Sequence, residues 1–140
     1  MFLGPPGAGK SELVLRLLGR GWVLVADDQV QLSADGEGAL LATPPESLRG
    51  MLEVRGLGLF RDMPVAAPAR LRLAVDLLPA GAILPRLPQP ARFAAEGRAI
   101  PRVVLPGHDA ATPDKVALAL DAACGRAHCV AGAFQRADAA

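Results

Sequence analysis

Short apolar runs, most of them bounded by glycine or proline, set the pattern of hydrophobic and polar positions along this chain. Residues 22–26 are apolar without interruption, which is typical of a strand buried on both faces. Residues 71–77 alternate between apolar and polar side chains, and this period of two predicts a half-exposed strand. Further strands are predicted at residues 2–3, 29–32, 39–42 and 99–105.

Turn-forming residues separate these runs. The Asp-Gly-Glu-Gly segment at residues 35–38 lies between two apolar runs and predicts a hairpin. Residues 46–50 read as a short turn or helical stub, and residues 51–60 as a strand that runs into a glycine-bearing loop. Four prolines within residues 79–90 exclude a regular helix and predict a loop.

Two segments carry the start and stop signals of helices. The first covers residues 11–18 and closes at the Gly-Arg-Gly of residues 19–21, where glycine suits a C-cap. The second covers residues 112–123. It opens on Thr112-Pro113-Asp114, which suits a cap followed by proline in the first helical position. We therefore expect an α/β domain with many strands and two main helices.

Composition narrows the function classes. The 140 residues suit one domain, residues 1–140, and 51% of them are hydrophobic. A formal net charge of +1, with no basic run and no aromatic series, argues against a nucleic-acid or membrane-surface partner. No signal peptide and no apolar run of membrane-spanning length is evident. We expect a cytoplasmic protein.

One segment matches the phosphate-loop motif G-x-x-x-x-G-K-[ST] at every fixed position. Its glycines allow a tight turn whose backbone N–H groups point inward as an anion nest. The lysine supplies a mobile positive charge for terminal phosphates, and the serine hydroxyl can bind Mg²⁺. The following helix directs the positive end of its dipole at the same ligand. The predicted phosphate-binding residues are Gly4, Pro5, Pro6, Gly7, Ala8, Gly9, Lys10 and Ser11.

An acidic pair follows one apolar run, and a further acid lies inside another. Asp27 and Asp28 come directly after the run at residues 22–26, so they are expected near the phosphate loop as a general base and a Mg²⁺ contact. The alternative is a solvated acidic turn. Glu53 lies in a mostly apolar step, where a metal ion or a partner such as Arg55 would relieve the cost of burial. The alternative is an ordinary surface residue of a strand.

Three motifs together resemble the catalytic domain of HPr kinase/phosphorylase. They are the phosphate loop ending in Gly-Lys-Ser-Glu, the Leu-Val-Ala-Asp-Asp of residues 24–28 and the Leu-Glu-Val-Arg-Gly-Leu-Gly of residues 52–58. A weaker likeness extends to Ile100-Pro101 and Leu105-Pro106-Gly107. The short form of the family, without its amino-terminal domain, looks most similar. The resemblance implies a phosphate-loop domain related to phosphoenolpyruvate carboxykinase, which agrees with the strand-rich pattern.

The resemblance also implies an activity. Members phosphorylate a seryl hydroxyl of HPr, the phosphocarrier protein of the phosphotransferase system, with ATP (in some members pyrophosphate) and Mg²⁺. In the reverse type of reaction, phosphate attacks phosphoseryl-HPr and releases pyrophosphate. The matching positions imply that Asp27 is the acid–base residue, that Asp28 supports it and that Glu53 helps Ser11 to hold the metal. Arg86 matches an arginine-bearing flexible loop, although a solvated loop cation is the alternative. A homo-oligomer is expected.

The chain departs from the family pattern at two places. Only Phe2 and Leu3 separate Met1 from Gly4, so the family's upstream hairpin and its histidine are expected to be missing. Longer members often have P-G-R-N before the last helix, where this chain has His108 in place of the arginine. Two other functions therefore stay open: a nucleotide-binding regulatory module without phosphoryl transfer, and a small-molecule phosphate-loop kinase.

Overall fold

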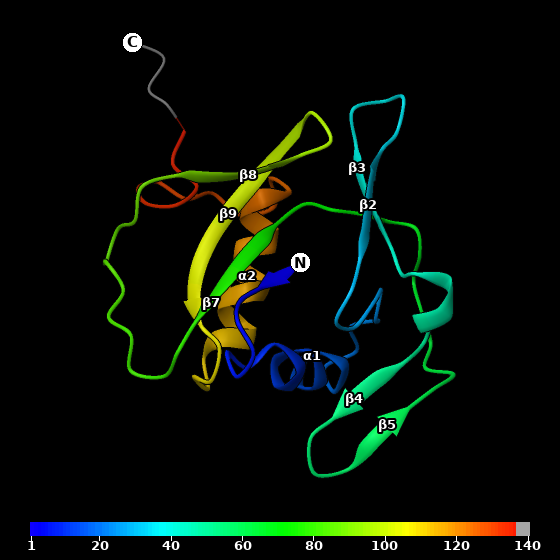
Figure 1. Ribbon diagram of the computed structural model, residues 1–140. Helices are drawn as coiled ribbons and strands as arrows, with labels where there is room; N and C mark the ends of the chain where they lie inside the picture. Colours follow the sequence, from blue (N-terminus) through cyan, green and yellow to red (C-terminus); the bar gives the residue numbers. More distant parts are fainter. Residues whose placement is uncertain (137–140) are drawn as a thin grey trace.

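A mixed four-stranded sheet forms the centre of the fold, which a computed structural model describes for residues 1–136 (Figure 1). The strand order is β1-β7-β9-β8. β1 (Phe2–Leu3), β7 (Ala74–Leu78) and β9 (Arg98–Pro106) run parallel, and β8 (Ala91–Ala95) runs antiparallel to β9. The carboxyl ends of the three parallel strands therefore meet at one edge, which is where ligand sites form in open α/β sheets.

Two helices, α1 (Lys10–Leu18) and α2 (Thr112–Ala123), contribute buried residues to the same core as this sheet: α2 packs along β9, and α1 packs against α2. Leu73, Val75 and Leu77 alternate along the chain and all enter this core, so the period of two selects the buried face. The other buried members of the core cluster are Ala8, Leu13, Leu17, Val103, Val116 and Ala119.

Two smaller sheets complete the fold. β2 (Gln31–Ala34), β3 (Leu40–Thr43) and β6 (Ala69–Arg70) form one antiparallel sheet in that order. The 3₁₀ turn η1 (Glu46–Leu48) leads to the second, a hairpin of β4 (Leu52–Val54) and β5 (Gly58–Phe60). Within residues 1–136, no helix is both long and apolar enough to cross a membrane.

Several sequence predictions are confirmed. The hairpin around residues 35–38 forms, and its turn is held by Asp35, whose carboxylate accepts the N–H groups of Glu37 and Ala39. Both helices form at the predicted residues to within one position, and residues 79–90 form a loop without helix or strand. The segment 51–60 is a complete hairpin rather than a strand followed by a loop.

The prediction of a doubly buried strand at residues 22–26 is wrong. Only Leu24 pairs, in an isolated parallel bridge with Val65, and the side chain of Val23 is 53% exposed. The run is apolar but does not join the central sheet, where β1 occupies an edge. Leu24 alone is deeply buried, which explains only part of the apolar pattern.

Other boundaries also differ from the sequence predictions. β7 begins at Ala74, three residues after the predicted start, and β8 was not predicted because its short segment has no clear alternation. Thr112 is not a cap: it lies inside α2, fully buried, and its hydroxyl donates a hydrogen bond to the carbonyl of Pro106. This bond ties the start of α2 to the end of β9.

Candidate phosphate-transfer site

The predicted phosphate loop connects β1 to α1 at the carboxyl edge of the central sheet. Gly7 and Gly9 have φ angles of 83° and 94°, a region that favours glycine, so the sequence pattern is required by the backbone here. The N–H of Ala8 donates to the carbonyl of Pro5 at 3.1 Å, which closes the tip of the loop into a turn. The side chain of Ala8 is buried in the core and anchors the loop.

Lys10 and Ser11 open α1, directly after this turn. The Lys10 ammonium donates to the carbonyl oxygens of Gly4 and Pro5, so it lies over the loop that it is expected to serve. The first N–H groups of an α-helix lack partners inside the helix, and they carry the positive end of its dipole. The Lys10 ammonium and these N–H groups therefore lie beside the same loop, with Ser11 next to Lys10 in the chain, and an anion with several oxygens suits this place.

A second loop, which follows β9, packs directly on the phosphate loop. A β-carbon built on residue 107 would lie 1.8 Å from the carbonyl oxygen of Ala8, so only glycine permits this approach. Arg16, one turn after Glu12 on α1, donates to the carbonyl oxygens of Gly107 at 2.7 Å and Asp109 at 3.1 Å. The helix that follows the phosphate loop thus also holds the second loop in place.

His108 contacts the phosphate loop. Its Nε2 donates to the carbonyl of Gly7 at 3.0 Å, and its Nδ1 lies 3.4 Å from a carboxylate oxygen of Glu12. The sequence indicated only that an anion contact at this position was in doubt. The partners Gly7 and Glu12 were not predicted, and neither was the role of Arg16, because nothing in the local pattern links segments this far apart in sequence.

The acidic residues predicted from two separate motifs are brought together. Oδ2 of Asp27 accepts the backbone N–H of Glu53 at 3.1 Å. Asp28 is exposed and has a φ of 61°, which non-glycine residues adopt rarely and aspartate more easily than most. The prediction that a strand delivers Asp27 and Asp28 is wrong in its detail, since contact with β4 positions Asp27 instead.

Glu53 is exposed, so the expected cost of burying its carboxylate does not arise. The apolar character of residues 51–54 is explained by Leu52, which is buried on the opposite face of the same strand. Within residues 1–136, neither Arg55 nor Arg86 makes an ion pair, and both side chains are exposed. The assignment of Arg86 to the site therefore stays a prediction.

The oxygen groups at this place suit Mg²⁺. Residues 1–136 contain no cluster of three or more histidine, cysteine, aspartate or glutamate side chains that could hold a metal ion by itself. Magnesium, however, usually takes one or two carboxylates and completes its shell with water and substrate phosphates. The Ser11 hydroxyl, Asp27 and Glu53 offer hard oxygen donors of this kind, and α1 packs against β4, which carries Glu53.

Comparisons with known proteins point to one family. The family model described as "HPr Serine kinase C-terminal domain" matches residues 1–77. HPr kinase/phosphorylase of Bordetella pertussis is 44% identical over 88 residues, which are 59% of this chain and 29% of that protein. The protein of the same name from Geobacillus sp. is 40% identical over 83 residues, or 55% of this chain and 27% of that protein. The chain thus spans less than a third of the length of these curated relatives.

A solved structure has the same fold. The Hpr(Ser) kinase/phosphatase from Coxiella burnetii matches with a TM-score of 0.70 and 23% sequence identity, over 85% of this chain and 78% of that one. At this identity the match establishes the shared fold. The family model covers the phosphate loop and the motifs that contain Asp27 and Glu53, which are the residues that the structure connects.

Proposed function

The chain belongs to the HPr serine kinase C-terminal domain family, and on that premise we propose that it transfers a phosphoryl group between ATP and a seryl hydroxyl of an HPr-type phosphocarrier protein. The observation that carries the proposal is the hydrogen bond from Glu53 to Asp27, which joins two family motifs into one acidic site beside α1. We include phosphorolysis of the phosphoseryl protein in the proposal, with pyrophosphate as product.

In the kinase direction, the loop N–H groups and Lys10 hold the terminal phosphates and offset the charge that develops during transfer. The carboxylate of Asp27 takes the proton from the seryl hydroxyl as the oxygen attacks the γ-phosphorus, and ADP leaves. Asp28 supports this carboxylate, and Ser11 and Glu53 would hold Mg²⁺. The metal, when bound, would neutralise charge on the phosphates during transfer.

In the phosphorolysis direction the same groups act in reverse. An oxygen of inorganic phosphate attacks the phosphorus of phosphoserine, the bond to the serine oxygen breaks, and Asp27 returns a proton to that oxygen. The products are the free hydroxyl and pyrophosphate. One carboxylate suits both directions because proton acceptance and proton donation are the same transfer read in opposite senses.

The surface beside the acidic pair suits a protein substrate. Glu53 pairs across the β4–β5 hairpin with Leu59, and the side chains of Leu57, Leu59 and Phe60 are 74%, 65% and 44% exposed. Neighbouring exposed apolar side chains are typical of surfaces that another macromolecule covers.

We further propose a fold of the phosphoenolpyruvate carboxykinase-related type, a homo-oligomer and a cytoplasmic place of action.

Transfer of label from ATP tests the proposal. The purified chain is incubated with γ-labelled ATP, Mg²⁺ and the HPr-type protein of its own organism, and the modified residue is located by mass spectrometry. We expect label on one serine, and its loss as pyrophosphate when unlabelled phosphate is added. If this chain and a version extended upstream both bind nucleotide but transfer no phosphoryl group, the kinase proposal fails. The alternative function, a nucleotide-binding regulatory module, would then be favoured.

A further inference from the structure

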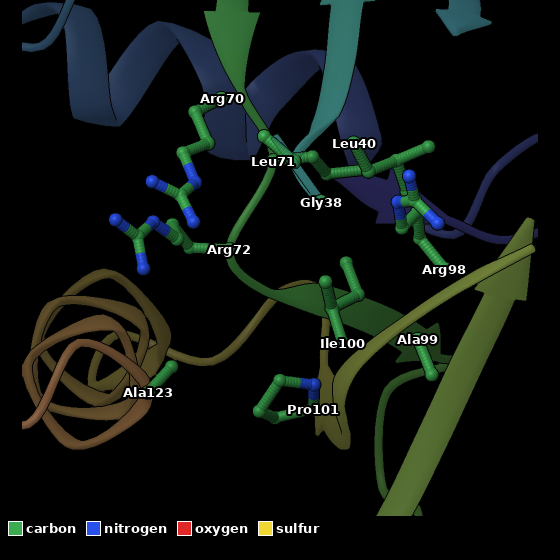
Figure 2. A pocket seen from close by; sticks show the side chains of 11 residues that line it. Gly38, Leu40, Arg70, Leu71, Arg72, Arg98, Ala99, Ile100, Pro101 and Ala123 are labelled. Carbon is green, nitrogen blue, oxygen red and sulfur yellow. The ribbon is translucent and has the colours of Figure 1, made fainter. Parts of the chain in front are cut away.

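A small pocket lies at the opposite end of the central strands from the phosphate loop. Its volume is about 170 Å³, and it lies between β3, β6, the start of β9 and the end of α2. Three arginines line it: Arg70, Arg72 and Arg98. Figure 2 shows the guanidinium groups of Arg70 and Arg72 turned to the same side of the opening, with Arg98 across from them and Ile100 between.

The positive charge of this pocket is not balanced by ion pairs. Within residues 1–136, none of the three arginines has a carboxylate oxygen within 4.0 Å. Asp35 is the acid that interacts with this positive charge. The pKa of its carboxyl is lowered mainly by hydrogen bonds from Ala39 and Glu37, and to a smaller extent by the charges of Arg70 and Arg98. Those two backbone bonds already occupy an oxygen of Asp35. Two of the three arginines, Arg70 and Arg98, therefore share one carboxylate, and one oxygen of that carboxylate already holds a turn.

Arg98 also holds a donor that has no acceptor. Its Nη2 donates to the carbonyl of Asp35 at 3.3 Å, whereas its Nε is buried and has no hydrogen-bond partner. A buried hydrogen-bond donor without an acceptor lowers the stability of the folded state. The cost is larger when the donor belongs to a charged group such as a guanidinium. An anion with several oxygens would accept from the exposed guanidinium groups of Arg70 and Arg72 and would reduce the repulsion among the three arginines.

The pocket is separate from the site proposed for phosphoryl transfer. Arg72 precedes β7 and Arg98 begins β9, whereas the phosphate loop lies beyond the carboxyl ends of these strands. At roughly 3.3 Å per residue, the nine residues of β9 span about 26 Å. A ligand bound at the phosphate loop therefore does not reach the arginine pocket. An anion that neutralises the three arginines would be a second, separate ligand.

We propose that this pocket binds a small phosphate-class dianion, either inorganic phosphate or the phosphate group of a small monoester. The planar guanidinium matches two oxygens of a phosphate at once, which makes arginine the usual residue for such recognition. The volume lies below the range of about 300–1,000 Å³ that is typical of pockets for larger organic ligands, so a nucleotide does not fit here. The proposal does not depend on the phosphoryl-transfer activity.

Amide chemical shifts of the isotope-labelled chain test this site. Inorganic phosphate and glycerol phosphate are titrated in parallel at constant ionic strength, and the N–H signals of Gly38, Ala39 and Ala99 report on the pocket. We expect saturable shifts that persist in Lys10→Ala, which weakens the phosphate loop. The ligand that saturates at lower concentration identifies the source as free phosphate or a monoester, and both results support the site.

Two variants separate a site from general attraction of anions. The double variant Arg70→Gln/Arg72→Gln should weaken binding at least tenfold, and it should keep a dispersed spectrum because both side chains are exposed. Arg61→Gln is the control: the side chain of this arginine is 85% exposed, pairs with Asp62 and lies outside the pocket. Equal weakening in the control and the double variant, or shifts at the pocket that do not saturate with either ligand, would overturn the proposal.

Discussion

The carbonyl oxygen of Ala8 lies where the side chain of residue 107 would begin, 1.8 Å from the position of a β-carbon on Gly107. Ala8 is in the phosphate loop and Gly107 follows the last strand of the central sheet, so this contact joins the loop before α1 to the loop before α2. Arg16 and His108 hold the same two loops together through the carbonyl oxygens of Gly107 and Gly7. The shape of the candidate site therefore depends on a segment that contributes none of its predicted ligands.

We predict that Gly107→Ala destabilises the domain and weakens phosphate-ligand binding. The added β-carbon meets a backbone oxygen, which cannot turn aside like a flexible side chain, so the two loops must separate. Overpacking of this kind costs about 1–3 kcal/mol of unfolding free energy. Denaturant unfolding and calorimetric titration with ATP check both effects. Gly36→Ala is the control, because a β-carbon there meets no atom within 4 Å; an unchanged Gly107→Ala variant would refute the loop contact.

The local elements of this fold were predictable because their signals are local. Glycines with positive φ mark the phosphate loop, and an Asp-Gly turn between apolar runs marks the β2–β3 hairpin. The site was predictable only in part. The sequence motifs predicted Asp27 and Glu53 as site residues. The hydrogen bond between them was not predictable, because it joins residues 26 positions apart.

The remaining contacts could not be predicted, because chain-distant pairing has no local signature. His108 and Gly7 are 101 residues apart. The apolar run at residues 22–26 indicated burial without indicating a partner, and in the described part of the chain its one strand pairing is the bridge between Leu24 and Val65. The arginine pocket is a similar case, since Arg70 and Arg98 are ordinary polar positions of two strands until the fold places them around one hollow.

We predict that Lys10→Ala lowers affinity for ATP and for pyrophosphate. The ammonium is the mobile cation of the phosphate loop, where it already contacts two loop carbonyls. Loss of a charge-assisted hydrogen bond costs about 1.5–3 kcal/mol, or roughly 10- to 150-fold in Kd. Titration calorimetry measures this change. Lys115→Ala removes the same charge from an exposed position of α2 and should bind normally; equal affinity in both variants would exclude the phosphate-loop assignment.

We predict that Glu53→Gln raises the Mg²⁺ concentration needed for half-maximal turnover. The amide keeps the size of the side chain and removes the charge that would attract the metal. Losses of about 10- to 100-fold in metal affinity are usual when groups that support a metal site are changed. Glu46→Gln, an exposed acid on the neighbouring η1 turn, serves as the control. An unaltered Mg²⁺ dependence would make Glu53 an ordinary surface acid.

We predict that the stabilising effect of Asp35 disappears in acid. The hydrogen bonds from Ala39 and Glu37 lower the pKa of its carboxyl below the ordinary value for an aspartate. A lowered folded-state pKa adds stability above the unfolded pKa, and this stability is lost as pH falls through the folded pKa. The Tm of Asp35→Asn should therefore fall below that of wild type at pH 7, and the difference should shrink below about pH 4. Glu37→Gln, in the same turn, should show no such convergence.

The last prediction concerns the shared proton. Asp27→Asn should bind nucleotide normally and lose both kinase and phosphorolysis activity by about 10²- to 10⁴-fold, because an amide cannot accept the seryl proton or return it. The substitution keeps an oxygen that can accept the N–H of Glu53, so the loop geometry survives. Asp28→Asn is the matched comparison, because it removes the neighbouring negative charge and leaves the proposed general base, Asp27, in place. Equal losses in Asp27→Asn and Asp28→Asn would indicate a purely electrostatic role. If Asp27→Asn keeps one activity and loses the other, the same carboxylate does not serve both directions.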